Sequence, residues 1–145
     1  MNLTGFMMFS ICVKSIYQSS VGMSTHPLNL ALRFLLEVTA IVAFGFSGYR
    51  LADNWTRIIW AIALPLVFTT IWGVFAVPND PSRSGKTVVP TPGIVRLLIE
   101  LALFSIAIWM IIDLGYTLAG WIFGAIAFLH YLISYDRITW LLKQK

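Results

Sequence analysis

The stretch Leu32-Arg33-Phe34-Leu35-Leu36-Glu37 places a basic and an acidic residue four positions apart within apolar sequence. A second stretch, Val95-Arg96-Leu97-Leu98-Ile99-Glu100, repeats this arrangement 63 residues later. On a helix, side chains four positions apart lie on one face and can pair. Because charged side chains are costly inside a bilayer, we expect both pairs to face protein or water. The doubled element predicts two similar helical hairpins with an ion-paired centre.

The composition predicts an integral membrane protein. Of the 145 residues, 59% are hydrophobic and 11% are charged, whereas about a quarter of the residues in a soluble domain are charged. The net charge of +4 comes from basic residues scattered over short connections and chain ends. That distribution is typical of membrane topology signals, and we therefore expect no nucleic-acid partner.

The apolar runs predict four membrane spans, at about 28–49, 58–77, 94–112 and 117–135. The fold class is all-α: an integral membrane four-helix bundle made of two pseudo-repeated helical hairpins, occupying residues 26–145. Residues 1–25 differ in composition and form an N-terminal extension. Two interpretations of this extension stay open: Met23 is the true initiator, or the extension is genuine.

The distribution of lysine and arginine predicts the orientation. With four spans, both termini and the central loop lie on one side, which carries Lys14, Arg83, Lys86, Arg137, Lys143 and Lys145. The opposite side carries Arg50 and Arg57. The positive-inside rule therefore places both termini in the cytoplasm.

Depth along the spans predicts a polar cluster near the cytoplasmic side. At a rise of about 1.5 Å per residue, the two glutamates lie on the order of 10 Å inside their helix ends. His130, Thr69 and Thr70 lie at a comparable level. The expected cluster therefore contains Arg33, Glu37, Arg96, Glu100, His130, Thr69 and Thr70.

Two interpretations of this cluster stay open. In the structural interpretation, the arginine and the glutamate of each pair neutralise each other, and this pairing offsets the free-energy cost of removing both charges from water. In the functional one, a glutamate exchanges protons and His130 acts as a relay. We expect no enzymatic activity, because no serine or cysteine motif accompanies His130. We also expect no cofactor and no metal: His26 precedes the first span and so cannot pair with His130 as a ligand, and the sequence offers too few ligands for zinc.

Three segments resemble the YrdB-like family of small bacterial membrane proteins. They are the opening Asn29-Leu30-Ala31-Leu32-Arg33-Phe34-Leu35-Leu36-Glu37, the central Trp72-Gly73-Val74-Phe75-Ala76-Val77-Pro78-Asn79-Asp80-Pro81-Ser82-Arg83, and Arg96-Leu97-Leu98-Ile99-Glu100. The family-like loop motif consists of Trp72, Pro78, Pro81 and Arg83. The resemblance covers roughly residues 28–135 and implies a four-helix protein of the bacterial inner membrane, without an established activity to transfer.

Two classes of function follow as expectations. The first is a structural or partner-binding helical module, whose partners are the lipid bilayer and either a second copy or another membrane protein. The alternative is a small homodimeric transporter or channel that uses Glu37, Glu100 and His130 to handle protons or a solute.

Overall fold

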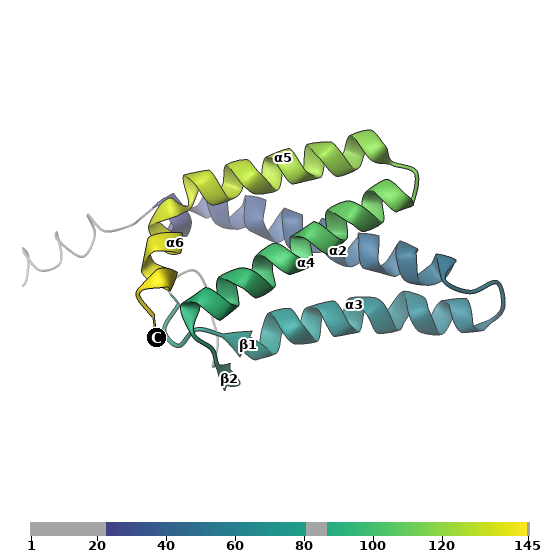
Figure 1. The fold of residues 1–145 in the computed structure, drawn as a ribbon, viewed down its shortest axis with the longest axis horizontal. Coiled ribbons are helices and arrows are strands. Elements are labelled where there is room, and N and C mark those ends of the chain that lie inside the picture. Colours follow the sequence, from purple (N-terminus) through teal and green to yellow (C-terminus); the bar gives the residue numbers. More distant parts are fainter. Residues whose placement is uncertain (1–22, 81–86, 145) are drawn as a thin grey trace, which may run out of the picture.

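The computed structural model describes residues 23–80 and 87–144, which are mostly helical (Figure 1). The short 3-10 helix η1 (Met23–Thr25) leads into α2 (Pro27–Arg50) and α3 (Thr56–Val74). Two short strands, β1 (Phe75–Ala76) and β2 (Val89–Pro90), pair in parallel. The chain then forms α4 (Gly93–Asp113), α5 (Thr117–Ile133) and α6 (Tyr135–Leu142). The N-terminal extension up to residue 22, together with Pro81 and Arg83 of the loop motif, lies outside the described residues.

Local sequence explains where the long helices begin and end. The His26 side chain accepts a hydrogen bond from the Leu28 amide and caps α2, and Pro27 occupies the first helical position, where its missing N–H costs nothing. The Asn54 side chain accepts a hydrogen bond from the Thr56 amide where α3 begins. Between α4 and α5, Gly115 adopts a φ of 95°, a conformation that glycine takes without strain.

Close contacts hold the helices in two antiparallel pairs, α2 with α3 and α4 with α5. At Gly48, an added Cβ would lie 2.3 Å from the backbone oxygen of Trp60, so only glycine permits this approach of α2 to α3. Gly120 has the same role on α5, where a Cβ would lie 2.5 Å from Ile112. α2 also contacts α4 and α5, so it joins the two pairs.

The second helix ends earlier than the sequence predicts. Helix was expected to residue 77, but α3 ends at Val74 and the chain becomes extended. The guanidinium of Arg96 donates hydrogen bonds from Nη1 to the carbonyl oxygens of Trp72, at 2.8 Å, and of Phe75, at 2.5 Å. The Ala76 carbonyl accepts from the Thr91 amide at 2.9 Å. These contacts satisfy carbonyl groups at the end of α3 and lead the chain into β1.

Three helices of the described chain, α2, α3 and α4, are long and apolar enough to cross a membrane. α5 and α6 pass the same test as a pair, but the chain bends by 68° between them. The expected fourth helix, over residues 117–135, is therefore continuous only to Ile133. α6 turns across the end of the molecule where α2 begins and α3 ends (Figure 1).

Candidate functional site

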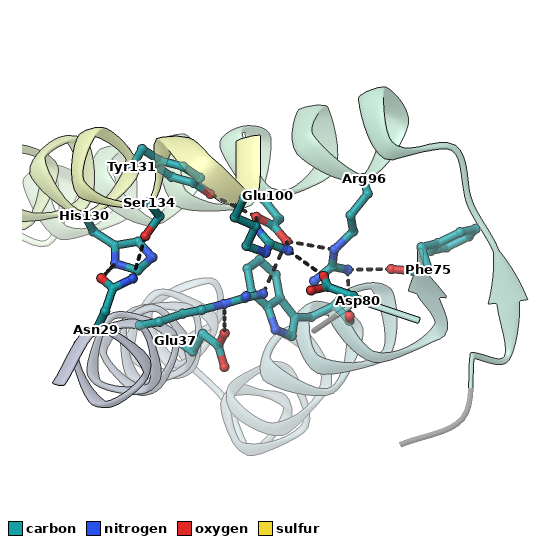
Figure 2. A network of polar contacts seen from close by, with 12 residues as sticks. Asn29, Glu37, Phe75, Asp80, Arg96, Glu100, His130, Tyr131 and Ser134 are labelled. Atoms are coloured by element: carbon teal, nitrogen blue, oxygen red, sulfur yellow. Dashed lines mark hydrogen bonds and ion pairs between the residues drawn. The ribbon is translucent and has the colours of Figure 1, made fainter. Parts of the chain in front are cut away.

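The side chain of Glu100, on α4, is the centre of a buried polar network (Figure 2). Only 1% of this residue is exposed. Its Oε1 accepts hydrogen bonds from Arg96 at 2.9 Å, Arg33 at 3.3 Å and Arg137 at 2.8 Å. Its Oε2 accepts from Arg137 at 2.9 Å and from the Tyr131 hydroxyl at 3.3 Å. One carboxylate thus binds three arginines from three helices, and Arg137 binds both of its oxygens.

The two Arg–Glu pairs form within their own helices, as the spacing of four allows, but their surroundings differ. Arg33 lies 3.0 Å from Glu37, and Arg96 lies 2.9 Å from Glu100. The side chain of Glu37 is 22% exposed, whereas that of Glu100 is 1% exposed. The two elements are alike in sequence, but one is at the centre of the network and the other at its edge.

Three members of the network were not predicted: Tyr131 on α5, Arg137 on α6 and Asp80 after β1. Arg137 Nη2 donates to Asp80 Oδ2 at 3.0 Å, and both side chains are buried. Arg137 was expected only as one of the basic residues on the side of the termini, because it has no acidic residue three or four positions away. Asp80 lies within the family-like segment that runs from Trp72 to Arg83 and follows Asn79, whose φ of 60° turns the chain. Its place in that segment was the feature of the sequence that could have indicated a role for Asp80.

The charges of the network balance. Three arginines (33, 96 and 137) lie with three carboxylates (Glu37, Asp80 and Glu100). Burying a charge is costly unless it is paired and hydrogen-bonded, and every member has such a partner. The network therefore links α2, α4, α6 and the segment after β1 at one end of the molecule.

Trp72 of the family-like motif lies against two of these arginines. The Arg96 guanidinium carbon lies 4.5 Å from the ring centroid, and that of Arg33 lies 5.5 Å from it. Both distances are within the range of a cation–π interaction. The ring also stacks on Phe68 at 5.9 Å and meets Phe104 edge-on at 5.5 Å. Trp72 thus connects the charged network to the apolar core.

His130 belongs to a neighbouring group instead. Its Nδ1 lies 2.9 Å from Asn29 Oδ1, and Asn29 Nδ2 donates to the Ser134 hydroxyl at 2.6 Å (Figure 2). All three residues are buried. This group fixes the start of α2 against the bend between α5 and α6. Asn29 and Ser134 were not predicted, because neutral polar residues near helix ends are common.

The expectation that Thr69 and Thr70 join the cluster is wrong. Both are exposed on α3. The Thr69 hydroxyl donates to the backbone oxygens of Pro65 and Leu66 in its own helix. A threonine in a helix readily satisfies its hydroxyl in this way, so comparable depth did not imply a shared face. Pro78 of the loop motif is also exposed.

Further contacts fasten α6 and the start of the described chain at the same end. The Ser24 amide and hydroxyl both donate to Asp136 Oδ2, at 3.2 and 2.8 Å. The Gly93 amide donates to the Gln144 carbonyl at 3.0 Å, and a Cβ at Gly93 would lie 1.8 Å from the Leu141 oxygen. Across residues 23–80 and 87–144, no group of three or more His, Cys, Asp or Glu side chains is arranged to hold a metal ion.

The fold and site define a class: a helical protein with at least three helices of membrane-crossing length and a buried arginine–carboxylate network at one end. Residues 31–128 match the family described as "Protein of unknown function (DUF2568)", and the chain belongs to this family. It is 39% identical over 116 residues to the uncharacterized protein YrdB of Bacillus subtilis (strain 168), covering 80% of this chain and 94% of that protein. No solved structure matches the chain.

Proposed function

We propose that the protein is a four-span protein of the bacterial inner membrane that acts as a structural or partner-binding module, not as an enzyme. In this proposal α2, α3, α4 and α5 cross the bilayer and α6 lies at its surface. A helix of 17 residues such as α5 is about 25 Å long. That length is close to the roughly 30 Å of a bilayer core, which supports a crossing by α5 before the bend.

The distribution of apolar side chains supports a lipid environment. Large hydrophobic residues are exposed on every long helix, including Phe34 at 62%, Leu66 at 58%, Trp109 at 64% and Trp121 at 65%. The charged network is buried instead. Soluble monomers rarely expose apolar patches beyond a few hundred Å². In a bilayer the same faces contact acyl chains at no cost.

The proposed orientation places both termini and the network on the cytoplasmic side. The start of α2, the two strands and α6 lie at one end of the molecule, and the short connections α2–α3 and α4–α5 lie at the other (Figure 1). The positive-inside rule assigns the first end to the cytoplasm. We further propose that the pairs α2–α3 and α4–α5 are repeats of one hairpin, because each carries its Arg–Glu element at the same end.

The burial of Glu100 carries the structural assignment. A carboxylate that is 1% exposed and is held by three arginines is poorly placed to exchange protons with water. The same contacts hold α2, α4 and α6 in fixed relative positions. Such a scaffold presents its outer faces to a partner in the membrane, either a second copy or another membrane protein.

The experiment combines assembly and stability. The purified protein is examined by light scattering in mild detergent, and native membranes are cross-linked to find a stoichiometric partner. The variant Glu100→Gln should lower the stability of the solubilised protein and loosen α6. A monomer without any cross-linked partner, or a Glu100→Gln variant as stable as the wild type, would contradict the proposed role.

One observation favours the second candidate, a homodimeric transporter or channel. The Glu37 carboxylate is 22% exposed at the edge of the network, whereas the Glu100 side chain is 1% exposed. Glu37 is therefore the better placed of the two to exchange protons. Proteoliposomes loaded with a pH-sensitive dye test this candidate. Proton flux that the wild type supports and a folded Glu37→Gln variant loses would favour transport over the structural role.

A further inference from the structure

A second site lies at the end of the molecule opposite the network. An apolar groove of about 330 Å³ runs between α2 and α3 and is lined by Val42, Gly45, Phe46, Tyr49 and Ala61. This volume is within the range of small-molecule sites. The α2 residues recur at helical spacing, so the groove follows the helix axes. Because Gly45 has no side chain, the groove stays open there.

Arg57 lies against Tyr49, one of the residues that line this groove. It lies one helical turn before Ala61 and therefore on the same face of α3. Its guanidinium carbon lies 4.6 Å from the centroid of the Tyr49 ring, and its Nη1 donates to the Tyr49 hydroxyl at 3.0 Å. The cation is thus held against the Tyr49 ring, beside the groove.

The hydrogen bonds of Arg57 are incomplete. Its Nε is buried and has no hydrogen-bond partner among the described residues. No carboxylate of the described chain lies within salt-bridge distance of it. A buried donor without a partner costs free energy, and a guanidinium matches the two oxygens of a phosphate group. A phosphate group at the accessible part of this half-buried guanidinium would balance its charge.

The level of Arg57 in the proposed membrane suits a lipid headgroup. It lies in the first turn of α3, beside the polar connection that contains Asp53 and Asn54. Trp55 is 73% exposed and Trp60 is 44% exposed at the same end. Exposed tryptophans are typical of the boundary between headgroups and acyl chains.

We propose that this groove binds a membrane glycerophospholipid, with its phosphodiester on Arg57 and one acyl chain along the groove towards Gly45. The charge beside the groove and the apolar lining match the two parts of such a molecule. The inference goes beyond the structural role of the network, since it uses the other end of the molecule and none of the network residues.

Native mass spectrometry of the purified protein tests the site, using phosphatidylglycerol, diacylglycerol with the same acyl chains, and inorganic phosphate as probes. The wild type should bind phosphatidylglycerol more tightly than diacylglycerol and should not retain phosphate alone. Arg57→Gln should weaken phosphatidylglycerol binding about fivefold, the effect of one surface cation on an anionic lipid. Gly45→Leu, which fills the groove, should weaken binding of both lipids.

Arg50→Gln is the matched control. Arg50 lies at the same end but donates to the Asp113 carbonyl, away from Tyr49, so its loss should weaken lipid binding less than the loss of Arg57 does. Arg57→Lys keeps the positive charge but loses Nε, and it provides a second test if Arg57→Gln does not fold. The affinity of the Arg57→Lys variant for phosphatidylglycerol should be lower than that of the wild type, by less than fivefold. Three results would overturn the proposal. The first is equal phosphatidylglycerol affinity of the wild type and both Arg57 variants. The others are equal losses of affinity in the Arg50 and Arg57 variants, and equal affinity of the wild type for phosphatidylglycerol and diacylglycerol.

Discussion

Replacing Glu100 with glutamine should destabilise the protein far more than the same replacement at Glu37. Glutamine keeps the shape of the side chain but carries one acceptor oxygen instead of two. Three donors converge on Oε1, so the amide oxygen would take that position and the NH₂ group would face Arg137 and the Tyr131 hydroxyl. The Tyr131 hydroxyl can accept from this NH₂ group, but the hydrogen bond from Arg137 Nη1 would be lost, at about 1.5–3 kcal/mol.

The network would also keep three arginines against two carboxylates. Breaking a buried ion pair by removing one partner typically costs about 3–5 kcal/mol, and this is the loss that we expect for Glu100→Gln. Glu37→Gln leaves the same excess of positive charge, but the Glu37 side chain is 22% exposed and Arg33 keeps its bond to Glu100. The hydrogen bond from Arg33 at 3.0 Å is weakened, so this replacement should cost about 0.5–1.5 kcal/mol. Since whole proteins are stable by about 5–15 kcal/mol, the two outcomes differ by a large part of the total.

The assay is reversible unfolding in mixed micelles with increasing dodecyl sulfate, followed by tryptophan fluorescence. The free energies of unfolding of the wild type, Glu37→Gln and Glu100→Gln are compared under one set of conditions. Similar losses in the two variants, or a loss below about 1 kcal/mol for Glu100→Gln, would refute the reasoning that burial and bond number distinguish the two elements.

Three further predictions concern packing around the network and between helices. Gly48→Ala should destabilise the α2–α3 pair by about 1–3 kcal/mol in the same assay, because the new Cβ would lie 2.3 Å from the Trp60 oxygen. Gly45→Ala is the control: its Cβ would make contacts of 3.5 Å, so it should change the stability little. Equal losses in the two variants would be inconsistent with this packing. Arg137→Met should speed amide hydrogen exchange across α6 while leaving the middle of α4 protected, and unchanged exchange in α6 would argue against the network as its anchor. Trp72→Leu removes two cation–π contacts and should cost about 1–4 kcal/mol of unfolding free energy; a loss indistinguishable from zero would exclude a supporting role for the ring.

Local features of the sequence predicted much of the helical structure. Long apolar runs located the helices, and the spacing of four in Arg33–Glu37 and Arg96–Glu100 placed each pair on one helix face. Both signals depend on residues close together in the chain. The polar cluster was expected near one end for the same reason, since depth follows from position along a helix.

Contacts between distant segments could not be predicted in this way. Arg137 reaches Glu100 because α6 bends by 68° from α5, and no residue pattern specifies that angle. The rotation of α3, which leaves Thr69 outside the cluster, depends on how Phe68 packs against Phe44 at 5.0 Å. The difference between Glu37 and Glu100 has the same origin, because neighbouring helices cover one carboxylate and leave the other at an edge.

The isolation of Glu100 from water is the central claim of the structural assignment. It is tested most directly by an experimental density map of the protein in a lipid nanodisc, at a resolution that shows ordered water. The account predicts that Arg33, Arg96, Arg137 and Tyr131 occupy the hydrogen-bonding positions around Glu100, with no water in contact with its carboxylate. A continuous chain of waters from the surface through Glu37 to Glu100 would contradict it and would favour proton handling at this site.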